Sequence, residues 1–404
     1  MRRRVLALIM AAVMIVPFAA CGQEPPTEKT SSGDVFKIGA YLPLSGPTAA
    51  YGIEGKNALD MAIKEINENG GFNGVPAELV AYDTQCSVEE AVKVASKLLQ
   101  EDKVDAMIGS LVSSEVFATG NVVNNAGVYM LGTGTSPNWM EEDWPYVFRA
   151  AMNNGASAPG TADMLKELDY KTVSIFYGQD DNALSTKDAF SAACEERGIE
   201  VVASESYDQG DTDFSAQAAN LINADADCVY LSVLGETAPV IVKQLRQYGY
   251  NGMIFNKESF MTAQIPVAGE ENSNHIAFVM PYVTYDSIED IDIPEIKTFA
   301  EKYDAAYGEI NKTDSAYRCW DAIMVMWEAS KIAKSNDSDA LKDATNQISG
   351  MKGLGGTIDF TDGNREGYNN YNSFILVDGK NVLWSDWIKN GGYEDFKNAA
   401  GQEK

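Results

Sequence analysis

The sequence predicts an α/β fold made of two lobes, each containing a doubly wound parallel sheet. The chain has 404 residues, more than one ordinary domain, and its 45% hydrophobic content suffices for a packed core. Short apolar runs alternate with segments of helical periodicity, which is the pattern of βαβ units and a parallel sheet. The alternation begins near Val35 and restarts near Thr172, so we expect two α/β units of similar construction.

In the first unit, strands and helices alternate from Val35 onward. Apolar residues at helical spacing from Ala58 to Ile66 indicate a helix that ends at the Gly-rich turn Asn69–Gly71. Two further helices are expected at Val88–Gln100 and Glu115–Asn125. The expected strands are Val35–Tyr41, Ala77–Tyr82, Val104–Gly109 and Val128–Leu131, with a loop at Leu42–Tyr51.

The second unit repeats the alternation and is followed by helices and a hairpin. Its expected strands are Thr172–Phe176, Glu200–Ser206, Cys228–Ser232, Gly252–Phe255 and His275–Met280, and its helices are Thr186–Arg197, Ser215–Ala224 and Pro239–Tyr248. Then come helices Pro294–Tyr307, Ser315–Lys334 and Ser338–Ile348 and strands Gly356–Phe360, Tyr371–Val377 and Leu383–Trp387. Asp378-Gly379 is a strong hairpin turn signal. If the three late helices return to the first unit, the chain crosses between the lobes more than once and forms a hinge.

The N-terminus predicts export. Residues 1–20, with basic Arg2–Arg4 and apolar Val5–Ala20, have the composition of a signal peptide. The small residues before Cys21 resemble the bacterial lipobox, in which the cysteine is acylated; the alternative is an ordinary cleaved signal with Cys21 incidental. Residues 21–34 are then a flexible tether. We therefore expect an extracytoplasmic protein, held at the bacterial cell membrane by its lipid anchor only.

Composition and motifs argue against several function classes. The formal charge of −28 disfavours binding to nucleic acid or anionic lipid. The sequence has one histidine, His275, and lacks the hydrolase motifs GxSxG and HExxH and the P-loop. Asp180 and Asp181 have no apparent further metal ligands. We expect no catalytic residue, no metal site and no cofactor.

The cysteines other than Cys21 show no metal-binding or redox spacing. Export permits disulfides, so a Cys194–Cys228 pair stays open beside the alternative of buried free thiols.

Two polar loops, Gly109–Ser114 and Gly132–Pro137, follow neighbouring predicted strands. Ligands bind at the carboxyl ends of parallel strands in open α/β sheets, and glycines let the backbone approach a ligand closely. Neither loop contains Lys, Arg, His or Cys. Ser113 or Ser114 is expected to open the helix at Glu115, where free N–H groups favour an anion. The loops therefore indicate a grip on a small polar molecule.

Several motifs in order resemble the type I periplasmic-binding-protein family, in its leucine/isoleucine/valine-binding branch. They are IGAYLPLSGPTAAYG, GKNALDMAIKEINENGGFNG, AYDTQC and the two polar loops, and the resemblance covers Val35 to Trp387. It implies two lobes joined by a three-segment hinge that closes on the ligand. Lobe one would comprise residues 35–151 and 283–369, lobe two residues 152–282 and 370–392, and residues 393–404 a C-terminal tail.

The resemblance also implies ligand-binding residues. Ser113 would bind a carboxylate, Thr133, Gly134 and Thr135 would hold the ligand's backbone groups, Tyr51 would line the pocket, and Glu258 would pair with an ammonium. The chain departs from the family's valine/leucine receptor at Asn182 and Leu234, where that receptor has tyrosines, and at Ser315, where it has phenylalanine. Val112 replaces the disulfide partner of Cys86. The amino-acid clasp is thus expected to be kept and the side-chain pocket rebuilt, with Tyr317 and Arg318 as possible rim residues.

The predicted function is an extracytoplasmic solute receptor of an ABC importer. It would capture a branched-chain amino acid or similar small zwitterion by hinge closure, as a monomer, and deliver it to a permease whose ATPase is a separate subunit. The alternative is a sensory receptor for an amino acid, amide or small carboxylate, coupled to a membrane signalling partner.

Overall fold

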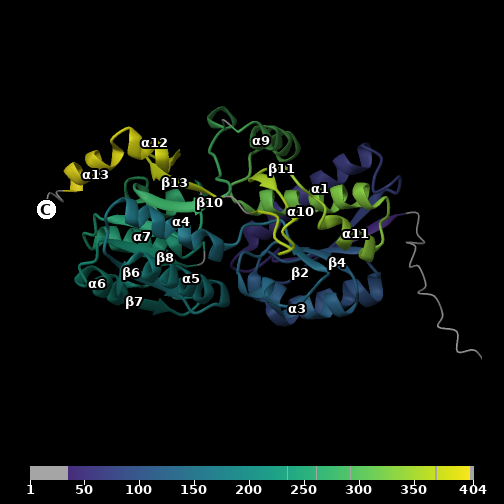
Figure 1. Cartoon of the computed structure of the whole chain (residues 1–404), viewed down its shortest axis with the longest axis horizontal. Coiled ribbons are helices and arrows are strands. Elements are labelled where there is room, and N and C mark those ends of the chain that lie inside the picture. Colours follow the sequence, from purple (N-terminus) through teal and green to yellow (C-terminus); the bar gives the residue numbers. More distant parts are fainter. Residues whose placement is uncertain (1–34, 234, 261, 292, 369–370, 401–404) are drawn as a thin grey trace, which may run out of the picture.

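A computed structural model describes residues 35–400 apart from positions 234, 261, 292, 369 and 370. The predicted signal peptide, Cys21 and Leu234 lie outside the described residues. The described chain forms two lobes side by side (Figure 1), with helices α4–α7 in one and α1, α3, α10 and α11 in the other. None of the helices in this part of the chain combines the length and hydrophobicity required to cross a bilayer.

Lobe one is built on a five-stranded sheet in which every neighbouring pair is parallel. In spatial order its strands are β2 (Ala77–Asp83), β1 (Phe36–Leu42), β3 (Ala106–Ile108), β4 (Tyr129–Gly132) and β5 (Val147–Arg149). Its helices are α1 (Ala49–Glu68), α2 (Val88–Lys97), α3 (Ser113–Asn125), α10 (Ser315–Ala333) and α11 (Ser338–Thr345).

Both faces of this sheet are buried, which is why its strands are almost continuously apolar. Along β1, Ile38 and Ala40 pack in one hydrophobic cluster with α1 and α10, and Tyr41 packs in another with α2 and α3. Successive strand residues point to opposite faces, so one strand supplies both layers. The doubly wound architecture is therefore confirmed for this lobe.

Lobe two has a seven-stranded sheet of the same type with an antiparallel edge. In spatial order its strands are β14 (Lys380–Leu383), β13 (Asn372–Val377), β10 (Ile276–Met280), β9 (Met253–Asn256), β8 (Cys228–Ser232), β6 (Thr172–Gly178) and β7 (Glu200–Tyr207). Strands β10, β13 and β14 pair antiparallel and the rest pair parallel. Its helices include α4 (Asn154–Glu167), α5 (Asp181–Arg197), α6 (Ser215–Asn223) and α7 (Ala238–Gln247).

The chain passes between the lobes three times, as the resemblance implied. The first crossing joins β5 to α4, and the second joins β10 to α9 (Pro294–Tyr307). The third leads from the small hairpin of β11 (Met351–Gly353) and β12 (Gly356–Ile358) to β13. These crossings place the carboxyl ends of β3 and β4 opposite the start of α5.

Several local expectations were wrong. Leu383–Trp387 was expected as a strand, but β14 ends at Leu383 and helix α12 (Trp384–Lys389) begins directly after it. Helix α1 begins at Ala49, inside the expected loop. Residues expected as a tail form α13 (Gly392–Ala400), whose Phe396 is buried against lobe two.

Other expectations were confirmed. Asp378 and Gly379 form the β13–β14 turn with φ of 49° and 75°, as a two-residue hairpin requires. Cys194 and Cys228 are buried free thiols rather than a disulfide, and Cys86 is unpaired.

Candidate functional site

A cavity of about 200 Å³ lies between the two lobes. This is smaller than the roughly 300–1,000 Å³ typical of sites for drug-sized ligands, so it suits a small solute. Five residues expected at the site line it: Tyr51, Ser113, Thr135, Asn182 and Glu258. The other lining residues are Thr48, Cys86, Val88, Leu111, Val112, Ser114, Asp180, Asp181, Gln209, Gly235, Glu236, Lys257 and Arg318.

The start of α3 forms the lobe-one side of the cavity. Ser113 opens this helix, as expected, but the helix begins there rather than at Glu115, and Val112 occupies the N-cap position without a side-chain hydrogen bond. The N–H groups of Ser113 and Ser114 lie in the first turn of the helix, so they have no hydrogen-bond acceptor within it. Together with the helix dipole they favour a negatively charged ligand group.

The Ser113 hydroxyl joins the two polar loops. Its Oγ accepts hydrogen bonds from the N–H groups of Thr135 and Ser136, both at 3.0 Å. Since both contacts use the oxygen as acceptor, the hydroxyl proton is available to an acceptor on a ligand. The side chain thus acts as a donor toward the cavity.

Gly134 and Thr133 stabilise this arrangement of the two loops without lining the cavity. A Cβ on Gly134 would lie 3.0 Å from both Cα and Oγ of Ser113, so a larger residue would require the loops to move slightly apart. Thr133 is fully buried and donates to the Gly109 carbonyl at 3.0 Å. Neither residue lines the cavity, and a direct ligand contact by either stays a prediction.

The lobes meet through the start of α5. Asn182 Nδ2 donates to Thr135 Oγ1 at 3.0 Å. Asp181 accepts from Asn138 Nδ2 at 2.8 Å and from Ser136 Oγ at 3.3 Å. The side chain of Asn182 therefore contacts the clasp of lobe one, whereas alignment had suggested a place in the side-chain pocket.

The residues after β9 bring two opposite charges to lobe two's side of the cavity. Lys257 and Glu258 are 1% and 8% exposed, and the Glu258 carbonyl is fixed by Asn256 Nδ2 at 2.9 Å. The Glu258 carboxylate forms no hydrogen bond or ion pair with any residue that the structure describes. Burial raises its pKa, while the neighbouring Lys257 ammonium acts in the opposite direction.

Arg318 closes the cavity from α10. It is 3% exposed and forms a 2.5 Å ion pair with Asp314, which precedes the helix. Its guanidinium carbon lies 5.9 Å from the centre of the Tyr51 ring. Tyr317, the other suggested rim residue, instead packs in the core against Tyr282 and Phe299.

The rest of the cavity wall is chemically mixed. Lobe one contributes Val88 and Leu111, and lobe two contributes Gln209 and Glu236. Sequence reasoning missed Val88, Gln209, Glu236 and Lys257, whereas Leu111 lies in the predicted polar loop Gly109–Ser114. For Lys257 a signal existed, because it directly precedes Glu258 at the end of a buried strand.

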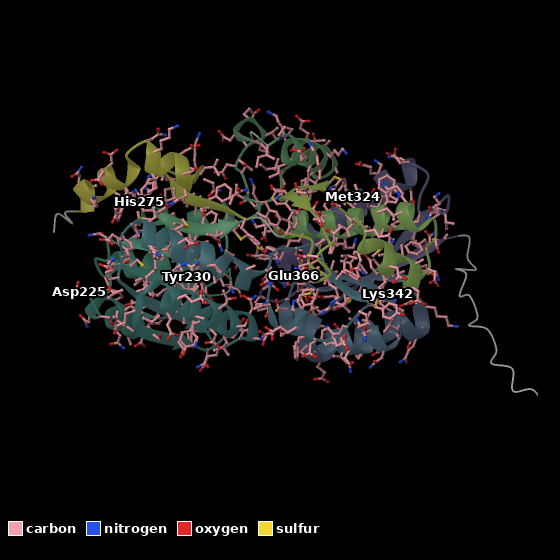
Figure 2. All side chains as sticks on the ribbon, viewed as in Figure 1. Asp225, Tyr230, His275, Met324, Lys342 and Glu366 are labelled. Carbon is pink, nitrogen blue, oxygen red and sulfur yellow. The ribbon has the colours of Figure 1, made fainter. Side chains whose placement is uncertain are left out.

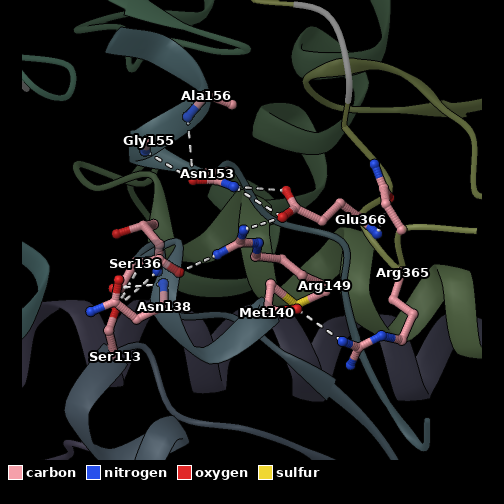
Figure 3. Close-up of polar contacts among 12 residues, drawn as sticks. Ser113, Ser136, Asn138, Met140, Arg149, Asn153, Gly155, Ala156, Arg365 and Glu366 are labelled. Atoms are coloured by element: carbon pink, nitrogen blue, oxygen red, sulfur yellow. Dashed lines mark hydrogen bonds and ion pairs between the residues drawn. The ribbon is translucent and has the colours of Figure 1, made fainter. Parts of the chain in front are cut away.

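A buried ion pair ties two hinge crossings together (Figure 3). Arg149, at the end of β5, is fully buried and its Nη2 lies 2.7 Å from Glu366 Oε1 in the third crossing. Asn153 Nδ2 donates to the same carboxylate at 2.9 and 3.1 Å, and Arg149 Nη1 donates to the Ser136 carbonyl at 2.6 Å. Figure 2 shows Glu366 between the lobes. The hinge is thus connected directly to the loop that contacts Ser113.

Sequence comparison finds similar proteins. Residues 35–380 match a family model described as a periplasmic binding protein. The leucine-, isoleucine-, valine-, threonine- and alanine-binding protein of Pseudomonas aeruginosa is 26% identical over 275 residues, covering 67% of this chain and 71% of that protein.

Solved structures share the fold. The branched-chain amino acid transporter substrate binding protein LivJ from Streptococcus pneumoniae, in complex with isoleucine, matches with TM-score 0.76 and 24% identity over 86% of this chain and 98% of that one. A solute binding protein of an ABC transporter from R. palustris, in complex with benzoate, matches with TM-score 0.76 and 21% identity over 87% and 95% of the two chains.

Proposed function

Because the chain belongs to the periplasmic binding protein family, we propose that it is the extracytoplasmic solute-binding receptor of an ABC importer and captures a small amino acid. The observation that carries the proposal is the separation of charge across the cavity. Free N–H groups and the Ser113 hydroxyl lie on lobe one, and the unpaired Glu258 carboxylate lies on lobe two. A zwitterion complements both sides at once.

The mechanism follows from the placement of these groups on different lobes. The amino acid first binds lobe one, where its carboxylate accepts hydrogen bonds at the start of α3. Closure of the hinge brings Glu258 against the ammonium and joins Thr135 to Asn182. Because the ligand contacts both lobes only in the closed form, it stabilises that form, which the permease then recognises.

Isothermal calorimetry with all the common amino acids tests the proposal. We expect saturable binding of at least one amino acid, and at least tenfold weaker binding of it by Glu258→Gln, since charge-assisted hydrogen bonds contribute about 1.5–3 kcal/mol. The control is Glu270→Gln, which changes an exposed carboxylate of the same lobe. Folded protein that binds no amino acid would refute the proposal.

The benzoate complex of a related fold shows that a carboxylate without an amine can also occupy such a protein. The same variant separates the two ligand classes. A strong loss of affinity in Glu258→Gln for the solute that the protein binds supports an ammonium group at this carboxylate, and an unchanged affinity argues against one.

A further inference from the structure

Lys257 is a buried cation that forms no ion pair with the described residues, although the carboxylates of Glu236 and Glu258 lie near enough to interact with its charge. Its Nζ donates to Asn182 Oδ1, and it forms no ion pair within 4.0 Å with any described residue. The main chain is fixed at this point, because the Lys257 N–H donates to the Leu231 carbonyl at 3.0 Å. An ammonium has three donors, so two remain for a group in the cavity.

The adjacent carboxylate interacts with this cation at longer range but forms no direct ion pair with it. Glu258 is buried as well, yet the described residues include no ion pair between the two side chains. An isolated buried charge is unfavourable unless an opposite charge and hydrogen bonds accompany it. Two neighbouring and separately unpaired charges are therefore suited to a ligand that carries one charge of each sign.

Hydrogen bonds place Lys257 on the side of the cavity where α3 begins. Lys257 Nζ contacts Asn182, Asn182 contacts Thr135 Oγ1, and the Thr135 N–H contacts Ser113 Oγ. Among charged groups the Glu258 carboxylate is influenced most by its neighbour Lys257, and then by Asp314 and Arg318, which lie at the start of α10. A zwitterion would thus place its carboxylate between Ser113 and Lys257 and its ammonium near Glu258.

We propose that Lys257 is the lobe-two half of the carboxylate site and makes the receptor selective for solutes with a free α-carboxylate. The inference rests on the proposed function and deepens it. Lobe one holds the carboxylate with neutral donors, and closure adds a full positive charge to it. An amino-acid amide would leave that charge buried and unpaired, so discrimination against amides would arise on lobe two.

A thermodynamic cycle between protein and ligand tests this role. Calorimetry would compare L-leucine, L-isoleucine, L-valine, L-threonine and L-alanine with their carboxamides, at a pH that keeps every amine protonated. We expect wild-type protein to prefer the acid at least tenfold. In Lys257→Met, affinity for the acid should fall about 10- to 100-fold while affinity for the amide changes little. A positioning role alone would weaken acid and amide equally.

Two further variants control for folding and for general charge effects. Lys257→Gln can still donate to Asn182, so it should keep the fold and yet lose the same discrimination. Lys243→Met removes an exposed lysine from the same lobe and should retain it. Thermal unfolding of each variant checks the fold.

The failures are distinguishable. Absence of binding of every common amino acid to folded wild-type protein would refute the proposed function and this inference with it. If wild-type protein binds an amino acid and Lys257→Gln either keeps its affinities for the acid and the amide or loses both equally, only the role of Lys257 would be overturned. The role would also be overturned if Lys257 made wild-type protein prefer L-glutamate to L-glutamine without any preference for α-carboxylates over α-carboxamides, because Lys257 would then bind a side-chain carboxylate.

Discussion

The ion pair between Arg149 and Glu366 makes a quantitative prediction about the hinge. In Glu366→Gln the guanidinium, fully buried, loses its only anionic contact among the described residues. Removing one partner of a buried pair typically destabilises by about 3–5 kcal/mol, because the remaining charge stays buried without compensation. For a domain of about 150–250 residues, the size class of one lobe, that loss corresponds to a fall in Tm of roughly 6–20 °C.

Urea unfolding followed by circular dichroism would measure the loss, with thermal scans as a second readout. The matched control is Glu295→Gln, which breaks an ion pair of 3.0 Å whose lysine, Lys352, is 80% exposed. Exposed pairs contribute about 0–1 kcal/mol, so this variant should unfold close to wild type. Equal stability of Glu366→Gln and wild type, or equal losses in the two variants, would refute the reasoning from burial.

Three further predictions concern the cavity and the helix that opens on it. Gly134→Ala places a methyl group 3.0 Å from Ser113 and should weaken ligand binding at least tenfold in calorimetry, because the loops must separate. Burial raises the pKa of Glu115 to about 7, so the stability linked to its neutral form is present below pH 4.5 and is lost as pH rises through 7. The unfolding free energy of wild-type protein should therefore fall between pH 5 and pH 8, and in Glu115→Gln this fall should be smaller by up to about 3 kcal/mol. The part of the fall that remains would come from Asp321, because burial also raises its pKa to about 7. Among the four described cysteines only Cys86 lines the cavity, so mass spectrometry should find that a thiol reagent modifies it first and that a saturating amino-acid ligand protects it.

The sequence predicted those parts of the fold in which local pattern and tertiary environment agree. Strand β8 is buried throughout and β1 is buried except at Lys37, so both appear as nearly continuous apolar runs. The β13–β14 hairpin was predictable because two residues with positive φ need a sequence such as Asp378-Gly379. The start of α12 was not, because Trp384 and Trp387 are held by packing against lobe two rather than by helix propensity.

The candidate site likewise contains residues that local sequence predicted and contacts that it did not. Ser113 and Thr135 lie in loops whose polar composition after apolar strands is visible locally, and the structure brings both to the cavity. The contacts of Asn182 with Thr135 and Lys257 join segments far apart in the chain. Nothing in local spacing encodes such contacts, so the partner of each polar group had to come from the structure.

The fixed hydroxyl of Ser113 has a consequence for the entropy of binding. Two main-chain N–H groups hold its oxygen, so the side chain loses its rotational freedom when lobe one folds rather than when a solute arrives. Immobilising a free polar side chain at an interface would otherwise oppose association by about 0.5–1.5 kcal/mol. The entropic penalty of capture then falls mainly on the relative motion of the lobes, and mutations that alter hinge freedom should change affinity without touching any group that contacts the solute.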